Sequence, residues 1–198
     1  SKEEKVLPRA TQIAAAIGLI YFSLTIMCSF FLYSSGLDIF DSLAHGMTII
    51  ATGGFSTKNM SIGHFDSIYT EIVTIVFMLI SALPFILIFY SLRNNFVDLF
   101  KNSQVQFFLL LVSLITLIVM FWLTKFYEVD YLQALRISSF AVISIATGSG
   151  FSTYDFSVWG SFTTLIFLFL MLVLAVAFGT ASNSFANSAI ILLNKLVS

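Results

Sequence analysis

The sequence IATGGFST, residues 50–57, recurs in the second half of the chain as IATGSGFST, residues 145–153. The two stretches are identical apart from one inserted residue, Ser149. Such a match within a chain of 198 residues indicates an internal repeat. The flanks agree as well, because each stretch follows an apolar segment and a short amphipathic one, and precedes a polar loop and a further apolar segment. The repeat therefore divides the chain into two copies of one structural unit.

The composition indicates that both copies lie in a membrane. Of the residues, 59% are hydrophobic, 16% are aromatic and only 10% are charged. A soluble globular domain carries roughly 25% charged residues, and a disordered chain is poor in aromatic residues. The net charge of −1 provides no basic field for nucleic acid. The expected surroundings are a lipid bilayer, with no nucleic-acid partner.

Four segments carry no charge and are predicted to be helical: residues 10–37, 72–92, 102–124 and 156–194. A helix needs about 20 apolar residues to cross the hydrocarbon core, so the first three segments each suit one crossing. The fourth segment is too long for one straight crossing. We expect it to break at a run of small residues, or alternatively to pack those residues against a neighbouring helix. The run comprises Gly179, Thr180, Ala181, Ser182, Asn183 and Ser184.

Two shorter apolar segments, residues 42–57 and 137–153, end in threonine, glycine and serine and are too short to cross. Such a segment can enter and leave on one side if its backbone is buried in protein or faces water. The predicted fold is therefore an all-α membrane protein with two repeats of membrane helix, re-entrant pore loop and membrane helix. The predicted divisions are a cytoplasmic segment (1–9), the first unit (10–92), a cytoplasmic linker (93–104) and the second unit (105–198).

The glycines of the two loops point to ion coordination. An ion stripped of water needs several oxygens at once, and backbone carbonyls supply them without burying a charge. Turning successive carbonyls toward one axis requires backbone angles that glycine adopts at low cost, hence Gly54 and Gly150. The preceding short helix directs its partially negative end to the same place, which favours a cation. Hydroxyls of Thr52, Thr147 and Ser149 can anchor the loops or add oxygens. Ordinary turn glycines are the alternative, and two near-identical loops argue against it.

Three stretches resemble the TrkH/KtrB superfamily of bacterial potassium transporters. They are IIATGGFSTKNMSIGHFDS at residues 49–67, ATGSGFSTYDFSVW at residues 146–159, and LPR at residues 7–9. The resemblance runs along nearly the whole chain and implies the second and third of four pore-loop units. It implies that Gly54 and Gly150 are filter glycines. It also implies that potassium, the transported ion, is held by backbone carbonyls with no cofactor, the further lining residues being Thr52, Gly53, Gly148 and Ser149.

The same resemblance implies a place and partners for the chain. Family members carry out potassium uptake across the bacterial inner membrane, form dimers of complete pores, and bind a cytosolic nucleotide-binding regulatory subunit of the TrkA/KtrA type. Two loops supply only half of a fourfold ring. The chain is therefore expected to be a fragment or one part of a split gene. The filter loops are expected to be external, because acidic residues gather near them while Arg9, Arg93 and Lys101 lie on the other side.

The last apolar segment departs from the family pattern. Family members interrupt this helix with a gating loop, a glycine-rich run followed by a lysine and an arginine. Here residues 179–184 form the gate candidate, but Ser182 to Ser184 replace glycines, and Ala186 and Ala189 replace the basic residues. The change leaves a non-conducting structural subunit as an alternative function. The preference between potassium and sodium stays open.

An intramembrane serine protease is a third reading of the sequence GSG at residues 148–150. A serine nucleophile needs a histidine base within hydrogen-bond reach. The only histidines, His45 and His64, lie in the first pore segment and the loop after it. The sequence therefore favours a transporter, which is not an enzyme, over a protease.

Overall fold

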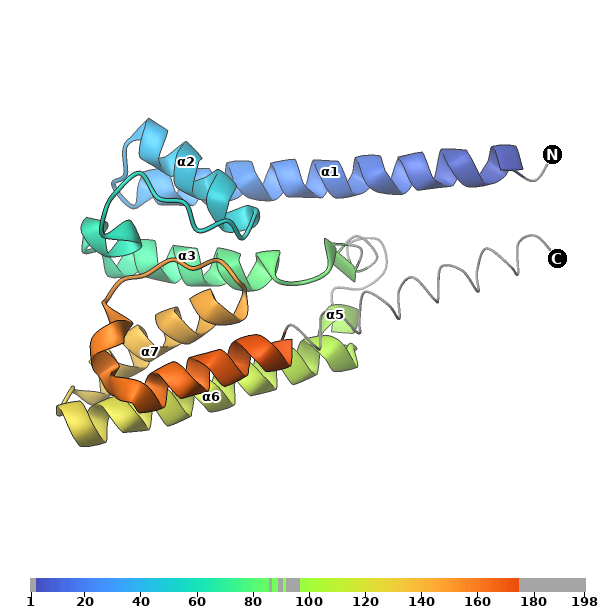
Figure 1. Ribbon diagram of the computed structural model, residues 1–198. Helices are drawn as coiled ribbons and strands as arrows, with labels where there is room; N and C mark the ends of the chain where they lie inside the picture. The colour runs from blue at the N-terminus through green and yellow to red at the C-terminus, as the bar shows by residue number, and fades with distance from the viewer. Residues whose placement is uncertain (1–2, 86, 89–90, 92–96, 175–198) are drawn as a thin grey trace.

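The computed structural model describes residues 3–85, 87–88, 91 and 97–174. The gate candidate at residues 179–184, together with Ala186 and Ala189, lies outside the described residues. Within the described part every regular element is helical (Figure 1). The all-α class predicted from the sequence is confirmed.

The first unit contains α1 (Glu3–Ser34), α2 (Ile39–Ile50), the short 3-10 helix η1 (Ser61–Phe65) and α3 (Ile68–Ser81). Within α1, the part Ala14–Ser34 is long and apolar enough to cross a membrane. The helix starts at Glu3, so it also includes most of the predicted N-terminal segment. By contrast α2 has 12 residues, about 18 Å at the helical rise, which is too short for the hydrocarbon core of about 30 Å.

The second unit repeats this order. After the short α5 (Val97–Lys101), which lies in the predicted linker, come α6 (Ser103–Tyr127), α7 (Tyr131–Ala146), the short η2 (Phe156–Trp159) and a further apolar helix, Gly160–Leu174. The 25 residues of α6 suffice for a crossing, whereas the 16 residues of α7 do not. Each unit thus has one long helix followed by one short helix that stops at a glycine-containing loop.

The predicted second span, residues 72–92, is interrupted in the structure. Helix α3 ends at Ser81, with Ala82 as its C-cap, three residues before Pro84. Proline has no N–H to donate and disfavours helical angles in the residue before it, so the helix stops instead of merely bending.

Both short helices begin at an aspartate N-cap. The carboxylate of Asp38 accepts a hydrogen bond from the backbone N–H of Asp41 at 2.6 Å, and that of Asp130 accepts one from Leu132 at 3.1 Å. A carboxylate at this position satisfies an unpaired donor and suits the positive end of the helix. These caps make the start of each short helix readable in the sequence.

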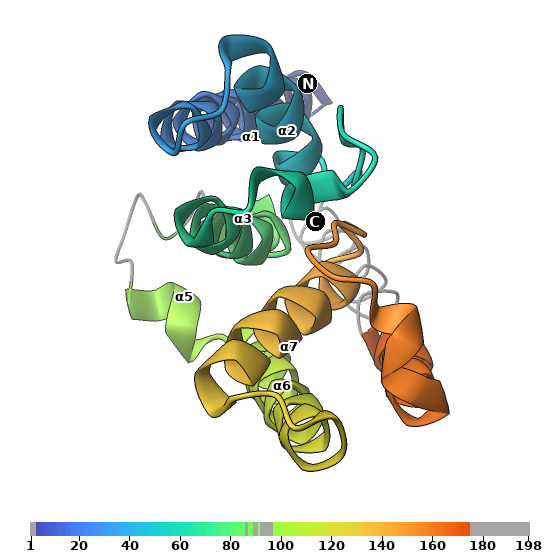
Figure 2. The ribbon, with the colours of Figure 1, turned by 90° about the vertical axis from the view of Figure 1, so that its left-hand side faces the viewer.

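The long helices α1 and α6 lie on opposite sides of the bundle, and each packs against the short helix of its own unit. Figure 1 shows α2 on α1, with α7 between α3 and α6, and Figure 2 shows the same bundle end-on. Gly46 allows the close crossing of α2 over α1, because a Cβ atom there would overlap the side chain of Ser29. The interior between the elements is mostly apolar and includes Leu32, Met78, Val119 and Phe140.

The outer faces of the long helices are apolar as well. On α1, Phe22 and Phe30 are exposed, and on α6 so are Leu110 and Phe121. A soluble monomer rarely exposes a continuous apolar face of this kind. Lipid is the surrounding that such helices fit, which agrees with the membrane location expected from the composition.

Candidate functional site

Thr48 of α2 closes the first glycine-containing loop at both ends. Its carbonyl oxygen accepts a hydrogen bond from the N–H of Gly53 at 2.8 Å. Its hydroxyl donates to the carbonyl oxygen of Phe55 at 2.9 Å. The loop therefore starts and returns on the last turn of the short helix, with residues 52–54 at its tip.

Ser144 of α7 does the same for the second loop. Its carbonyl accepts from the N–H of Ser149 at 3.0 Å, and its hydroxyl donates to the carbonyl of Phe151 at 2.6 Å. Ser149 is itself buried, and its hydroxyl lies 2.8 Å from that of Thr147. The two loops are thus built by one scheme from two chemically similar hydroxyl residues.

These hydrogen bonds correct the register between the two loops. Matching the letters of the sequence treats Ser149 as an insertion and pairs Gly53 with Gly148. The hydrogen bonds instead pair Gly53 with Ser149, because both donate to the carbonyl of the equivalent hydroxyl residue. The second unit is longer than the first in its short helix and not in its loop. Helix α7 has 16 residues and α2 has 12, a difference of about one helical turn. Gly54 and Gly150 remain equivalent.

Backbone angles alternate in the same way in both loops. In the first, Thr52 has a φ of +50° and Gly54 one of +68°, whereas Gly53 between them does not have a positive φ. In the second, Gly148 at +72° and Gly150 at +73° flank Ser149, which also lacks a positive φ. Alternating left-handed and ordinary angles turn successive carbonyl groups toward one side of the chain. The loops can therefore present a row of oxygens.

Thr52 is the unusual member of this set. A β-branched residue with positive φ is a genuine outlier, because its side chain crowds the backbone. Such strain is kept only where the surroundings over-determine the conformation, and it collects at functional sites. The equivalent position of the second loop is Gly148, which adopts the same angle without that strain.

The two loops touch through their backbones. A Cβ atom on Gly54 would overlap the carbonyl oxygen of Ser149. Among the described residues, apart from the immediate chain neighbours, no atom lies within 4 Å of the place where a Cβ would stand on Gly148 or Gly150. The first loop therefore packs against the second, while the glycines of the second loop face open space.

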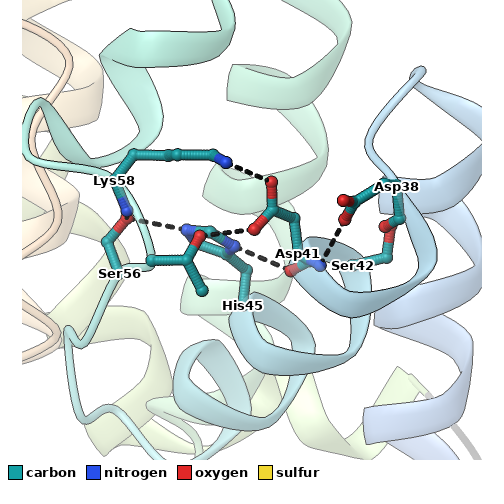
Figure 3. Close-up of polar contacts among 7 residues, drawn as sticks. Asp38, Asp41, Ser42, His45, Ser56 and Lys58 are labelled. Carbon is teal, nitrogen blue, oxygen red and sulfur yellow. Dashed lines mark hydrogen bonds and ion pairs between the residues drawn. The ribbon is translucent and has the colours of Figure 1, made fainter.

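A polar network lies behind the first loop (Figure 3). Asp41, in the first turn of α2, is buried with 5% of its surface exposed. Its carboxylate accepts a hydrogen bond from the Thr57 hydroxyl at 2.6 Å and pairs with the Lys58 ammonium at 2.9 Å. The Thr57 hydroxyl, and to a smaller extent Lys58, hold the pKa of Asp41 below its usual value despite the opposing effect of burial. The network fastens the chain that leaves the loop back onto α2.

His45 extends this network toward the second unit. It is fully buried, with Nδ1 2.7 Å from the carbonyl oxygen of Asp41 and Nε2 2.8 Å from Ser56 Oγ. Its ring packs edge-on against Phe65, with centroids 5.4 Å apart, and lies 6.2 Å from Phe151 of the second loop. Both ring nitrogens are engaged, so this histidine is not placed as a base for Ser149.

Sequence reasoning missed this buttressing role of His45. The signal was present, because His45 follows Asp41 by four residues and so lies on the same face of the helix. Its partner Ser56 sits beyond the loop, and only the folded chain brings the two together. As for metals, the described residues include no group of three or more His, Cys, Asp or Glu side chains that could hold an ion.

Comparison with known proteins identifies the family of this chain. The family model for the cation transport protein TrkH matches residues 1–190. The chain belongs to the TrkH family of cation transport proteins. The family resemblance predicted from the sequence is confirmed, and the chain belongs with membrane transporters rather than enzymes.

Individual TrkH relatives match most of this chain. The Trk system potassium uptake protein TrkH of Halomonas elongata is 40% identical over 171 residues, which cover 84% of this chain and 35% of the relative. The TrkH protein of Escherichia coli is 33% identical over 172 residues, again 84% and 35%. The crystal structure of the potassium transporter TrkH from Vibrio parahaemolyticus superposes with a TM-score of 0.77 at 34% identity, covering 82% of this chain and 36% of that one.

The matched region is a part of each relative. The chain spans about a third of the length of the TrkH proteins it matches, 35% of the Halomonas protein and 36% of the Vibrio structure. The helical arrangement described above is therefore that of a section of a TrkH-type membrane protein.

Proposed function

We propose that this chain supplies two adjacent pore units of a potassium uptake transporter, and that its two loops form half of a ring of carbonyl oxygens selecting potassium. The observation that carries the proposal is the alternating backbone at residues 52–54 and 148–150, repeated in equivalent positions of two loops that touch. One such loop could be an ordinary turn. Two equivalent loops in backbone contact suit a shared ion path.

The chemistry of the proposed site follows from the backbone. Carbonyl oxygens would replace the hydration shell of the ion without a buried carboxylate. The C-terminal ends of α2 and α7 are partially negative and adjoin the loops, which favours a cation over an anion. The proposed ion-coordinating residues, all acting through carbonyl oxygens, are Thr52, Gly53, Gly54, Gly148, Ser149 and Gly150.

Further pore units would complete the ring. The open side of the second loop adjoins an apolar pocket of about 390 Å³ lined by residues that include Gly148, Gly150, Phe167 and Met171. A following unit placed there would meet Gly150 as the second unit meets Gly54. We use the term assembled pore for this chain together with the units that complete the ring.

The remaining parts of the proposal rest on the family. The assembled pore would sit in the bacterial inner membrane, form dimers and bind a cytosolic nucleotide-binding regulatory subunit. Residues 179–184 stay the candidate gate. The names of the relatives, Trk system potassium uptake proteins, support the substrate.

Transport by the assembled pore tests the central claim. In cells that lack their own potassium uptake systems, it should restore growth at low potassium, and in liposomes it should conduct potassium in preference to sodium. This chain alone in liposomes should give no selective flux, because half a ring cannot strip an ion of water. An assembled pore that fails to take up potassium, or an isolated monomeric chain that conducts it selectively, would refute the proposal.

Cysteine labelling tests the proposed external position of the loops. Cys28 is the only cysteine and is fully buried, so background labelling should be low. Asn59→Cys places a thiol at an exposed position beside the first loop, and Gln104→Cys places one at the opposite end, at the start of α6. A membrane-impermeant maleimide added to intact spheroplasts should label the first variant and not the second. The reverse pattern would overturn the orientation.

A further inference from the structure

In the first unit, an ion pair connects the segment that follows the filter loop to the short helix α2. Lys58 follows the loop, and its ammonium lies 2.9 Å from the carboxylate of Asp41 on α2. Both partners belong to the same unit, so the tie needs nothing from elsewhere. It holds the exit of the first loop at a fixed distance from the helix that precedes it.

The second unit has a tie at the same place in the repeat, made from different residues. Tyr154 occupies the position of Lys58, with the same separation along the chain as between Gly54 and Gly150. Arg136 Nη2 on α7 donates a hydrogen bond to the Tyr154 hydroxyl at 3.1 Å. The cation therefore sits on the helix instead of on the chain that leaves the loop.

No carboxylate is available for this cation at the corresponding place within the second unit. In the register of the repeat, the position of Asp41 is taken by Ile137, a buried aliphatic residue. A partly buried guanidinium without an anion is costly, because it loses hydration and gains no opposite charge. Arg136 has 28% of its side chain exposed, so it depends on a partner from another element.

Glu71 of α3, in the first unit, supplies the missing charge. Its Oε2 lies 3.1 Å from Arg136 Nε, and only 7% of the Glu71 side chain is exposed. Neither of these two atoms meets the geometry of a hydrogen bond. The contact is therefore ionic, and its strength depends on the two charges and on their burial.

Other contacts join the same two regions. The N–H of Gly63 in η1 donates to the carbonyl of Ser152 at 3.1 Å, and the N–H of Ser152 donates to the hydroxyl of Ser61 at 3.3 Å. The exit of the second loop is thus held on both sides by residues of the first unit. The segment that follows the first loop is tied to its own unit by the Lys58–Asp41 ion pair, whereas the segment that follows the second loop also depends on contacts with the first unit.

We propose that Glu71 is a positioning residue for the second filter loop, acting through Arg136 and Tyr154 across the boundary between the two units. The inference rests on the proposed function, since it concerns the selectivity of that ion path. Loss of the Glu71 charge would free Arg136, and Arg136 would no longer hold the chain that follows Gly150. The carbonyl row of the second loop would then widen or tilt.

The test measures potassium-to-sodium selectivity of the assembled pore in liposomes, separately from the amount of protein present. Glu71→Gln keeps the size of the side chain and removes its charge. We expect the selectivity ratio to fall about three- to tenfold, which lies in the lower part of the range for coupled residues in contact. Glu128→Gln, the same change at an exposed position at the end of α6, serves as the matched control and should keep the wild-type ratio.

Two more variants separate positioning from simple stability. Tyr154→Phe removes the acceptor for Arg136 and should lower the ratio less than Glu71→Gln. The double variant, Glu71→Gln with Tyr154→Phe, should not lower the selectivity ratio further than Glu71→Gln alone, because both changes break the same chain of contacts. A change confined to thermal stability or to the amount of protein, with the ratio unaltered in both single variants, would overturn the inference. Failure of the wild-type pore to select potassium would instead refute the proposed function.

Discussion

Gly54 lies against the carbonyl group of Ser149, so the two repeats of the chain meet backbone to backbone at their loops. No side chain intervenes at this point, and none could be inserted without moving one loop. This contact couples the position of each row of carbonyl oxygens to the other. Changes at the contact should therefore affect stability and ion selection together.

The contact predicts unequal effects for alanine at the two equivalent glycines. Gly54→Ala combines an unfavourable positive φ with overlap against Ser149, and should destabilise the purified chain by about 2 kcal/mol or more. Gly150→Ala meets only the backbone penalty, about 1 kcal/mol. Thermal unfolding in detergent would measure both. Gly36→Ala is the control for backbone strain alone, because Gly36 has a positive φ and, in the part of the chain that the structure describes, only its chain neighbours lie within 4 Å of an added Cβ. Equal losses for Gly54→Ala and Gly36→Ala would contradict the contact.

In the assembled pore, both loop substitutions should reduce the preference for potassium over sodium. The reason is that either change redirects carbonyl groups that are proposed to coordinate the ion. The measurement is the flux ratio in liposomes, compared with that of the Gly36→Ala pore. If the Gly54→Ala and Gly150→Ala pores both discriminate as well as the wild type, these loops are not the filter.

The backbone strain at Thr52 predicts that Thr52→Gly leaves the free energy of unfolding unchanged or raises it slightly. Thr52→Gly removes the crowding of a β-branched side chain at φ +50°, worth about 1 to 2 kcal/mol, and adds a glycine entropy cost of about 0.5 to 1 kcal/mol. The chain should therefore unfold at the same or a slightly higher temperature. A loss of more than about 1 kcal/mol would mean that the threonine side chain makes a contact more important than its strain.

The crossing of α2 over α1 predicts a rescue between two residues. Gly46→Ala should destabilise the chain by about 1 to 3 kcal/mol, because its methyl group overlaps the Ser29 side chain. Ser29→Ala removes the oxygen that is closest to it. The double variant should therefore recover part of the loss, which a double-mutant cycle from thermal unfolding would detect. Strictly additive losses would show that the two helices separate instead of sharing a contact.

The lowered pKa of Asp41 predicts acid sensitivity. The folded chain binds this proton less tightly than the unfolded chain does, so the stabilising contribution is complete above the usual aspartate pKa of about 3.9. It is lost as the pH falls below that value through the folded pKa. Asp41→Asn should be less stable at neutral pH and should flatten the fall in stability in this acid range.

Thr57→Val provides the intermediate case for the same measurement. It removes the hydroxyl that contributes most to the lowered pKa but keeps the ion pair with Lys58. Its stability should fall less steeply with acid than that of the wild type and more steeply than that of Asp41→Asn. An unchanged acid slope in both variants would show that Asp41 does not control this range.

Much of the fold could be predicted because it depends on local chemistry. Charge-free segments predicted the long helices, and the threonine, glycine and serine residues predicted where the short helices end. The short helices start earlier than the predicted residues 42 and 137, at Ile39 and Tyr131, because Asp38 and Asp130 cap them. The segment predicted at residues 72–92 is interrupted, because α3 ends at Ser81, shortly before Pro84. Contacts between side chains that are brought together only by folding could not be predicted. His45 illustrates this, since its partner Ser56 lies on the far side of the loop.

By itself the sequence determined that the chain is a pair of membrane units with a glycine-containing loop in each, because hydropathy and backbone freedom are properties of neighbouring residues. Only the tertiary structure decided how the units relate. It paired Ser149 with Gly53 instead of treating it as an insertion, and it brought Glu71 to Arg136. Hydrogen-bond register and ion pairing depend on distances between helices, and those distances arise only when the apolar faces have packed.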